Sequence, residues 1–283
     1  MTRVGLCAHA AKPAARALLP ELVAWLRGRH HEVCLLPEDA ASYGFDDTST
    51  PREAFGTLDL LVVLGGDGTM LHGIELAGLA GVPVLGVNLG ILGFLTEVGP
   101  DDVFDALERT LAGERSLDER STVQADVVRS GDVVDRLGEG INEVSVERGV
   151  GGKLIRMALT IGGQKFTTFG ADGMIVATPT GSTAYAFSMR GPVVSPELRC
   201  LDVVAVGAHG LFDRPLVVAD DQDVQIRVLF GGRGIVLLDG NPCTEIGEGD
   251  VLRARVGPST VRLVRLGPDS FFTRLARRFG LPE

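Results

Sequence analysis

The residues with the clearest chemical potential are five in a row, Gly65-Gly66-Asp67-Gly68-Thr69. Glycines let a backbone come close to a phosphate and point its N–H groups at the phosphate oxygens. A carboxylate beside a phosphate is unfavourable unless it holds a magnesium ion or accepts a proton from an attacking hydroxyl. We therefore predict a phosphate-binding turn with Asp67 as the catalytic residue and Thr69 as the cap of the following helix. The alternative is a plain strand-to-helix turn that Asp67 caps.

A second group of polar residues lies between Asp172 and Ser188, where the stretch TPTGSTAY spans Thr178–Tyr185. Small hydroxyls and backbone N–H groups can recognise ribose and phosphate oxygens without adding charge. Ser182 is predicted to cap a short helix within this stretch. The alternative interpretation is a Ser/Thr-rich turn. The candidate ligand contacts in this group are Asp172, Thr180, Thr183, Ala184, Tyr185 and Ser188.

Four more polar residues could contact a ligand. Asn142 and Glu143 pair an amide with a carboxylate, which suits the hydroxyls of ribose and the amine of adenine; the alternative is a solvated strand end. Asn88 lies in the glycine-rich run Gly86–Gly93, which either contacts a ligand or only links a strand to a helix. His72 comes one turn after the glycine loop, where it can face a bound phosphate.

Composition and missing motifs exclude several classes of protein. The formal net charge of −10 argues against a nucleic-acid binder, which needs a basic surface. The sequence has no G-x-x-x-x-G-K-[ST] loop, which argues against a P-loop enzyme, and no clean G-x-G-x-x-G, which argues against an ordinary NAD dehydrogenase. It also has no G-x-S-x-G elbow, which argues against a Ser-His-Asp hydrolase. No set of His, Cys and carboxylate residues has metal-ligand spacing. The four cysteines are predicted to be buried free thiols in a reducing compartment.

Neither a membrane span nor a leader peptide is expected. No apolar run approaches the ~18–20 residues that cross a bilayer. The stretch after Arg3 is apolar, but His9 and Lys12 interrupt it. A strand that enters a helix explains this stretch better than a signal peptide does.

The glycine turn needs a regular framework, and strands alternate with helices as far as about Ser116. The run DLLVVL at Asp59–Leu64 is apolar throughout, as in a strand buried on both faces of a parallel sheet. Such alternation predicts an α/β fold, in which ligands bind beyond the carboxyl ends of the strands. The expected strands are Arg3–Ala8, Glu32–Leu36, Asp59–Leu64 and Val82–Val87, the expected helices are Pro13–Arg29, Thr69–Leu79 and Asp101–Leu111, and Asp46–Arg52 is an expected loop.

From Thr122 onward the pattern changes to short strands separated by turns, which predicts a β-rich, antiparallel region. The tail Asp269–Phe279 has an apolar face and is predicted to be a helix capped by Asp269. A short helix is expected at Ser182–Phe187. The expected strands are Thr122–Arg129, Arg136–Glu147, Lys153–Ile161, Lys165–Phe169, Gly173–Ala177, Val203–Val206, Leu216–Val218, Val224–Phe230, Ile235–Leu238, Val251–Val256 and Val261–Arg265.

Taken together, these motifs resemble the NAD kinase family. GGDGT alone is weak evidence, because lipid kinases and phosphofructokinases carry similar turns, whereas TPTGSTAY with an upstream Asn-Glu pair is far more specific. The resemblance covers most of the chain, with the motifs in the right order. The matching stretches are GGDGT at Gly65–Thr69, GVNLGILGFLTE at Gly86–Glu97, NE at Asn142–Glu143, DGMIVATPTGSTAYAFS at Asp172–Ser188, GPVVSP at Gly191–Pro196 and RPLVV at Arg214–Val218.

The resemblance implies an N-terminal α/β domain with a Rossmann-like parallel sheet and a β-rich, sandwich-like C-terminal domain. We expect the α/β domain at residues 1–117, the NAD-binding sandwich at 118–267, and at 268–283 a C-terminal helix that packs back on the first domain. The family implies an active site between the domains, ATP as phosphoryl donor with Mg²⁺ or another divalent cation, and a homodimer or homotetramer in the cytoplasm. Some members accept polyphosphate.

Carried over by position, the resemblance also implies roles for individual residues. Asp67 would take the proton from the 2′-hydroxyl of the adenosine ribose of NAD, so that the product is NADP. Gly68 and His72 would line the same site, and Asn142 with Glu143 would hold the adenosine of NAD. The implied ligand-binding residues are Gly65, Gly66, Gly68, Thr69, His72, Asn88, Asn142, Glu143, the cationic contact Lys153, Asp172, Thr180, Thr183, Ala184, Tyr185, Ser188 and Asn241, which stands where the family often has glutamine.

The sequence departs from the family pattern at a few positions. Ile91 stands where an arginine is usual, and Arg190 follows Met189 where small residues are usual. Such a change in cations could redirect recognition of a phosphate or a ribose. Two other hypotheses therefore stay open: a kinase of the same fold that acts on another nucleoside or nucleotide, and a non-catalytic sensor that binds NAD. A lipid kinase is disfavoured, because the chain shows no basic membrane-facing helix.

Overall fold

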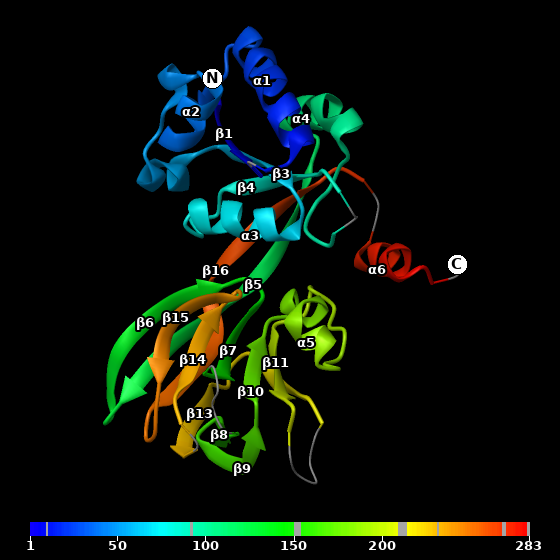
Figure 1. Cartoon of the computed structure of the whole chain (residues 1–283). Helices are drawn as coiled ribbons and strands as arrows, with labels where there is room; N and C mark the ends of the chain where they lie inside the picture. Colours follow the sequence, from blue (N-terminus) through cyan, green and yellow to red (C-terminus); the bar gives the residue numbers. More distant parts are fainter. Residues whose placement is uncertain are drawn as a thin grey trace. The chain divides into compact units, whose positions relative to one another are not determined.

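The computed structural model describes residues 1–9, 11–90, 93–149, 154–208, 214–230, 232–267 and 270–281. The chain divides into two compact units, one formed by Met1–Glu119 with Val261–Glu283 and the other by Arg120–Thr260. Two long strands, β5 (Ser116–Arg129) and β16 (Val251–Arg265), have residues in both units (Figure 1). No helix in the described ranges is both long enough and apolar enough to span a bilayer.

The first unit is built on a parallel sheet in the order β2, β1, β3, β4, which the end of β16 continues. All six residues of β3 are buried, as the apolar run predicted, because β3 has a neighbouring strand on each side and helices on each face. The strands are β1 (Arg3–Ala8), β2 (Glu32–Cys34), β3 (Leu60–Gly65) and β4 (Pro83–Asn88).

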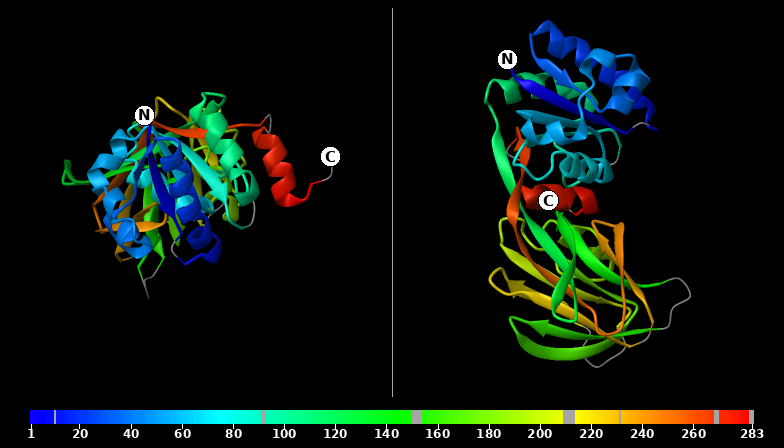
Figure 2. Two further views of the ribbon diagram at one scale, coloured as in Figure 1. Left: turned by 90° about the horizontal axis from the view of Figure 1, so that it is seen from above. Right: turned by 90° about the vertical axis from the view of Figure 1, so that its left-hand side faces the viewer.

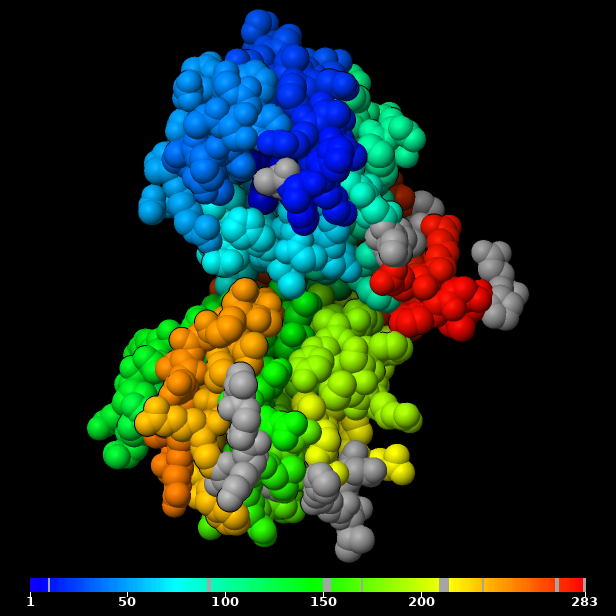
Figure 3. Space-filling model, viewed as in Figure 1, coloured from blue at the N-terminus to red at the C-terminus, as the bar shows by residue number. Residues whose placement is uncertain are grey.

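Helices cover both faces of this sheet (Figures 1 and 2). Helices α1 and α4 share a core cluster with Val62 and Leu64 on one face. Gly73 of α3 lies so close to Val63 on the other face that a Cβ at position 73 would stand 2.5 Å from the valine side chain. The helices are α1 (Pro13–Gly28), α2 (Pro37–Tyr43), α3 (Asp67–Leu76), α4 (Val103–Leu111) and α6 (Phe271–Phe279), with 3₁₀ turns at Asp46–Thr48, Arg52–Thr57 and Pro100–Asp102. In α6 Arg274 is the buried residue, and other parts of the helix form surface (Figure 3).

The second unit is a β-sandwich. An antiparallel six-stranded sheet, in the order β12, β11, β10, β7, β14, β15, packs against a layer made of β9, β8, β13, β16, β5 and β6. The further strands are β6 (Asp132–Gly140), β7 (Glu143–Arg148), β8 (Ile155–Ile161), β9 (Gln164–Ala171), β10 (Gly173–Ala177), β11 (Cys200–Val206), β12 (Leu216–Ala219), β13 (Val224–Phe230), β14 (Gly234–Leu238) and β15 (Asn241–Ile246). A 3₁₀ turn at Gly181–Thr183 and the short helix α5 (Tyr185–Ser188) follow β10.

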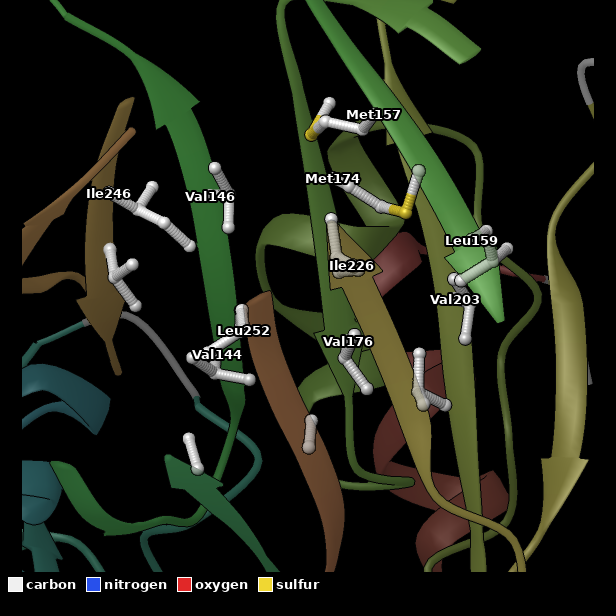
Figure 4. Close-up of a cluster of buried hydrophobic side chains, with 14 of the residues drawn as sticks. Val144, Val146, Met157, Leu159, Met174, Val176, Val203, Ile226, Ile246 and Leu252 are labelled. Atoms are coloured by element: carbon white, nitrogen blue, oxygen red, sulfur yellow. The ribbon is translucent and has the colours of Figure 1, made fainter. Parts of the chain in front are cut away.

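Apolar side chains from the two layers of the sandwich interleave to form its core (Figure 4). Val144 of β7 and Met174 of β10 belong to the same buried cluster as Met157 of β8. Every second residue along these strands points into the cluster, as the alternating pattern of the sequence requires. The predicted fold class, a parallel α/β region followed by a β-rich antiparallel region, is therefore confirmed.

Several predicted element boundaries are wrong. The single strand expected at Arg136–Glu147 is two strands, β6 and β7, with a break at Ile141–Asn142. The two strands expected within Val251–Arg265 are one, because a long strand can pair with β13 along its first part and with β4 at its end. Helix α2 and strand β15 had no clear pattern in the sequence.

The ends of the chain also differ from expectation in detail. Ser270 caps α6 by accepting a hydrogen bond from the Thr273 N–H, whereas the predicted cap Asp269 lies outside the described residues. The end of β16 belongs to the first unit, because Arg262 and Leu263 pair with β4. The cysteines are free thiols, but Cys243 is exposed rather than buried.

Candidate active site

Asp67 is the first residue of α3, and its carboxylate is held by backbone groups far along the chain. Its Oδ2 accepts the N–H of Phe94 at 3.0 Å, and its Oδ1 accepts the N–H of Leu95 at 3.1 Å. A Cβ at Gly93 would fall on this carboxylate, so only glycine permits the approach. The N-cap of α3 is Gly66, without a side-chain cap. The carboxylate therefore does not cap its own helix, and Thr69, predicted to be the cap, lies inside the first turn.

The glycine turn presents backbone N–H groups at the start of α3 that have no partner inside the helix. The first intrahelical bond across this turn joins the Met70 N–H to the Gly66 carbonyl, which leaves the three preceding N–H groups without a helical partner. Among the described residues, a side chain at Gly66 or Gly68 would meet nothing within 4 Å, so this part of the chain leaves both positions open to an approaching group. Gly65 is different, because a Cβ there would overlap the side chain of Thr69. The turn thus has the features of an anion-binding helix terminus.

Asn88 lies beside this turn, because β4 and β3 pair with Asn88 opposite Gly65 at the carboxyl ends of the strands. Its side chain exchanges two hydrogen bonds of 3.2 Å with the backbone of Gly90, so it shapes the loop after β4. Lys12 reaches the same loop, with Nζ 3.4 Å from the Leu89 carbonyl oxygen. The sequence patterns gave no signal for Lys12, although its place at the start of α1, in the loop that follows β1, puts it at the same edge of the sheet. His72 is half exposed, with Nδ1 4.0 Å from Glu75 Oε2.

In the second unit, Glu143 is the first residue of β7, and Asn142 precedes it in a tightly held turn. Asp239 Oδ1 accepts the N–H groups of Asn142 at 2.7 Å and of Glu143 at 3.0 Å, and its Oδ2 accepts the N–H of Ile141 at 2.8 Å. From the other side, the Asn142 carbonyl accepts the N–H of Thr178 at 2.8 Å. The sequence signal for Asp239 was the Asp-Gly pair that turns β14 into β15, and no role had been predicted for it.

Glu143 is the buried ionisable group of this turn. Burial, together with the negative charge of Asp239, raises the pKa of Glu143 to about 8, although the backbone N–H of Tyr185 acts in the opposite direction. Within the described residues, Glu143 Oε2 is buried and has no hydrogen-bond partner. At neutral pH the group is therefore a carboxylic acid that can donate one hydrogen bond and accept others. Such an unsatisfied polar atom is costly in a folded core and is typical of a site that awaits a ligand.

The hydroxyl-rich loop after β10 bonds largely to itself. Ser182 Oγ donates to the Pro179 carbonyl at 2.6 Å and accepts the N–H of Val194 at 2.9 Å, so the predicted capping of a helix by Ser182 is wrong. Thr183 Oγ1 donates to the Thr180 carbonyl at 3.1 Å, and Arg120 Nη1 donates to Thr180 Oγ1 at 3.3 Å. These bonds fix the loop shape, and each hydroxyl oxygen keeps the capacity to accept a further hydrogen bond.

The structure brings some predicted residues of this unit together and separates others. A Cβ at Gly181 would overlap the Asn142 carbonyl, and the Tyr185 N–H interacts with Glu143, so the start of α5 lies against the Asn142–Glu143 turn. Ala184 precedes α5, and Ser188 ends it in an exposed position. Asn241, the exposed first residue of β15, follows the Asp239-Gly240 turn.

Asp172 lies at the opposite end of β10 from the Asn142–Glu143 turn, but it is close enough to act on the Tyr185 side chain. Burial raises the pKa of Tyr185, and the negative charges of Glu147, Glu143 and Asp172 raise it further. Gly173, the neighbour of Asp172, pairs with Glu147, whereas Ala177 at the other end pairs with Glu143. Asp172 is linked instead to Arg148, with Arg148 Nη1 3.3 Å from Asp172 Oδ1. The predicted cationic contact Lys153 and the variant position Ile91 lie outside the described residues.

Comparison with known proteins gives a consistent answer over both units. The model of the ATP-NAD kinase N-terminal domain matches residues 4–115, and that of the ATP-NAD kinase C-terminal domain matches residues 141–266. A NAD kinase of Heliobacterium modesticaldum is 38% identical over 279 residues, which cover 98% of this chain and 98% of that protein. NAD kinase 2 of Streptomyces avermitilis is 40% identical over 286 residues, or 99% of this chain and 94% of that protein.

Solved structures share the fold. The yeast NADH kinase in complex with NADH matches with a TM-score of 0.90 and 23% identity, covering 100% of this chain and 89% of that chain. An NAD kinase from Archaeoglobus fulgidus in complex with ATP matches with a TM-score of 0.76 and 23% identity, covering 99% of this chain and 100% of that chain. The two family models together span most of the sequence, and the relatives match it nearly end to end. The chain therefore belongs to the ATP-NAD kinase family.

Proposed function

We propose that this protein transfers the γ-phosphoryl group of ATP to the 2′-hydroxyl of the adenosine ribose of NAD, giving NADP. A phosphotransferase with an alcohol acceptor is the activity of the family to which the chain belongs, and the relatives named NAD kinase align over its full length. The observation that carries the proposal is the Asp67 carboxylate, fixed by the N–H groups of Phe94 and Leu95 beside the open amino end of α3.

Asp67 is proposed to act as the general base. Each carboxylate oxygen receives one N–H donor and keeps further lone-pair capacity, so the group can accept a proton from a ribose hydroxyl without losing its orientation. Phosphoryl transfer demands mainly positioning and neutralisation of phosphate charge. The N–H groups in the first turn of α3 supply part of that charge stabilisation, in the way that helix termini bind phosphates.

A divalent cation, Mg²⁺ in the first instance, fits this proposal as a companion of ATP. Within the described residues, no three His, Cys, Asp or Glu side chains gather into a metal site. Mg²⁺ is commonly held by substrate phosphates, waters and one or two carboxylates, and Asp67 is a carboxylate at the phosphate turn. When bound, such an ion would neutralise charge that develops on the transferred phosphoryl group.

The Asn142–Glu143 turn is proposed to hold the adenosine of NAD. The neutral carboxyl of Glu143, with its unpartnered Oε2, can satisfy a hydroxyl or amine that a ligand brings. Asn142 and the backbone around Tyr185 add amide donors and acceptors nearby. Thr180, Thr183, Ala184, Ser188, Asn241 and Lys153 stay predicted ligand contacts, as do His72, Asn88 and Asp172.

The direct test is formation of NADP from NAD, ATP and Mg²⁺, followed with a dehydrogenase that is specific for NADP. We expect wild-type turnover and a loss of about 10²–10⁴-fold in kcat for Asp67→Asn, as for other general bases. Asp101→Asn, an exposed acid of the same unit, is the matched control. Absence of NADP with ATP or polyphosphate at every pH tested would refute the proposal.

Assays with a panel of phosphoryl acceptors, together with NAD-binding measurements, distinguish this proposal from the two other hypotheses. Better turnover of NADH, or of another adenosine-containing acceptor, would favour a kinase of the same fold with altered specificity. Tight NAD binding in calorimetry without phosphoryl transfer would favour a sensor. We further propose a homodimer or homotetramer in the cytoplasm; light scattering at several concentrations tests the first point, and the free thiols are in keeping with a reducing compartment.

A further inference from the structure

The Asp67 donors belong to a segment without regular secondary structure, residues 94–97. Phe94, Leu95 and Thr96 are almost fully buried, with 8%, 3% and 1% of their surface exposed. At the end of the segment, the Glu97 N–H donates to the Gly86 carbonyl at 2.8 Å. The rest of the segment has no strand ladder to hold it, so side chains must fix the positions of the two N–H groups that bind Asp67.

Two buried arginines supply this support. Arg265, the last residue of β16, points its guanidinium at three successive carbonyls, those of Phe94, Leu95 and Thr96, at 3.3–3.4 Å. Arg274, from the middle of α6, donates to the Thr96 carbonyl at 3.0 Å. Each guanidinium therefore donates hydrogen bonds to backbone carbonyls of the segment whose N–H groups bind the Asp67 carboxylate.

Glu97 joins the two arginines. Its Oε2 lies 3.0 Å from Arg265 Nη1 and 2.7 Å from Arg274 Nη2, and its Oε1 accepts the N–H of Leu266 at 2.8 Å. The side chains of Glu97, Arg265 and Arg274 are only 5%, 8% and 8% exposed. Burial opposes ionisation of Glu97, yet its pKa is lowered, because the Leu266 N–H and both guanidinium groups favour the charged form.

Helix α6 also contacts the segment through aromatic rings. Phe94 lies 6.0 Å from Phe271 and 6.5 Å from Phe279, measured between ring centroids, in tilted arrangements. These distances are in the range of favourable aromatic pairs. The ring of Phe94 thus packs against α6, while its N–H binds Asp67 and its carbonyl binds Arg265.

Buried ion pairs are weak evidence for stability, because apolar residues of similar size often serve as well. Their advantage here is directional: planar guanidinium groups fix several oxygens at once. We propose that the C-terminal helix is part of the catalytic machinery, with Arg274 as a positioning residue that holds the 94–97 segment and thereby the Asp67 carboxylate. The inference rests on the proposed function only for its kinetic readout.

The experiment compares Arg274→Met and Arg274→Lys with Arg278→Ala, an exposed arginine of the same helix. We expect Arg274→Met to lower kcat by about 10–100-fold, the size of effect that a small misplacement of a catalytic group produces, with KM for NAD and ATP changed less than about 3-fold. Arg274→Lys should restore part of the loss, since it keeps a charge for Glu97 but cannot also reach Thr96 in the same fork. Arg278→Ala should behave as wild type.

Two further readouts distinguish positioning from general stability. In an Asp67→Asn background, Arg274→Met should cause no additional loss of kcat, because Arg274 is proposed to act on kcat only by positioning the Asp67 carboxylate, which is already absent. Amide hydrogen exchange should be slow at Phe94 and Leu95 in wild type and faster in Arg274→Met. If Arg274→Met does not fold, Arg274→Lys and the wild-type exchange decide.

The proposal is overturned by fast exchange of these two amides in wild type, by unchanged exchange and kcat in the folded variants, or by a loss that adds in full to that of Asp67→Asn. Exchange is measured without substrate. If the protein makes no NADP, the proposed function is refuted, but the exchange rates of the Phe94 and Leu95 amides still test the positioning role of Arg274.

Discussion

Asp239 offers the sharpest test of how the nucleotide-binding turn is built. Its carboxylate accepts three consecutive backbone N–H groups, from Ile141, Asn142 and Glu143, at 2.7–3.0 Å. Asp239 itself has a φ of 47°, in the left-handed region that asparagine tolerates and alanine does not. Asp239→Asn is therefore the cleanest perturbation, because it removes the charge and one acceptor without adding backbone strain.

The expected magnitude follows from the bonds that survive. A carboxamide oxygen can replace Oδ1 and keep the N–H groups of Asn142 and Glu143, whereas the NH₂ group would face the Ile141 N–H. One charge-assisted bond is lost and the others become neutral. With hydrogen bonds to charged groups worth about 1.5–3 kcal/mol and neutral ones about 1 kcal/mol, the lost bond removes about 1.5–3 kcal/mol and each weakened bond removes about 0.5 kcal/mol or more. We therefore expect the free energy of unfolding to fall by at least about 2.5 kcal/mol.

The assay is urea unfolding followed by circular dichroism, with Asp132→Asn as control because that aspartate is exposed at the start of β6. In kinetics, Asp239→Asn should raise KM for NAD more than KM for ATP, since the turn it holds is proposed to bind adenosine. A variant with wild-type unfolding free energy and wild-type KM for NAD would show that the three bonds neither support the turn nor prepare it for ligand.

Three further predictions concern charge and space at the two sites. Burial raises the pKa of Glu143 from 4.5 to about 8, so the native state keeps a proton that the unfolded state releases. Its stabilising effect is complete below pH 4.5 and is lost as the pH rises to about 8; Glu143→Gln should flatten that decline in urea midpoints measured from pH 5 to 8. Asp202, whose pKa burial raises to about 7 and whose oxygens have no partner among the described residues, should behave likewise: Asp202→Asn should stabilise the protein at pH 8 and have little effect at pH 5, and equal effects at both would contradict the assignment. Gly93→Ala should cut kcat by about 100-fold, because its Cβ displaces the Asp67 carboxylate, whereas Gly99→Ala, which meets nothing within 4 Å, should leave kcat unchanged.

Local patterns in the sequence were enough to predict the elements that frame the first site. The apolar run of β3 predicted a strand buried on both faces, and the glycines after it predicted a turn into a helix; both lie where they were expected. The alternating strands of the second unit and the amphipathic C-terminal helix could likewise be predicted, because a period of 2 or 3.6 residues depends only on neighbours along the chain. Which residues each polar group contacts did not follow from these patterns.

Contacts between distant residues were decided by tertiary structure alone. Asp67 is held by Phe94, 27 residues away, and Asn142 by Asp239, 97 residues away. The break between β6 and β7 exists because Asp239 takes up the N–H groups that a continuous strand would have paired, and the hydroxyls of Ser182 and Thr183 turn inward because nearby carbonyls accept them. Periodicity records which face of an element is buried, whereas a hydrogen bond depends on atoms that only folding brings within 3 Å of one another.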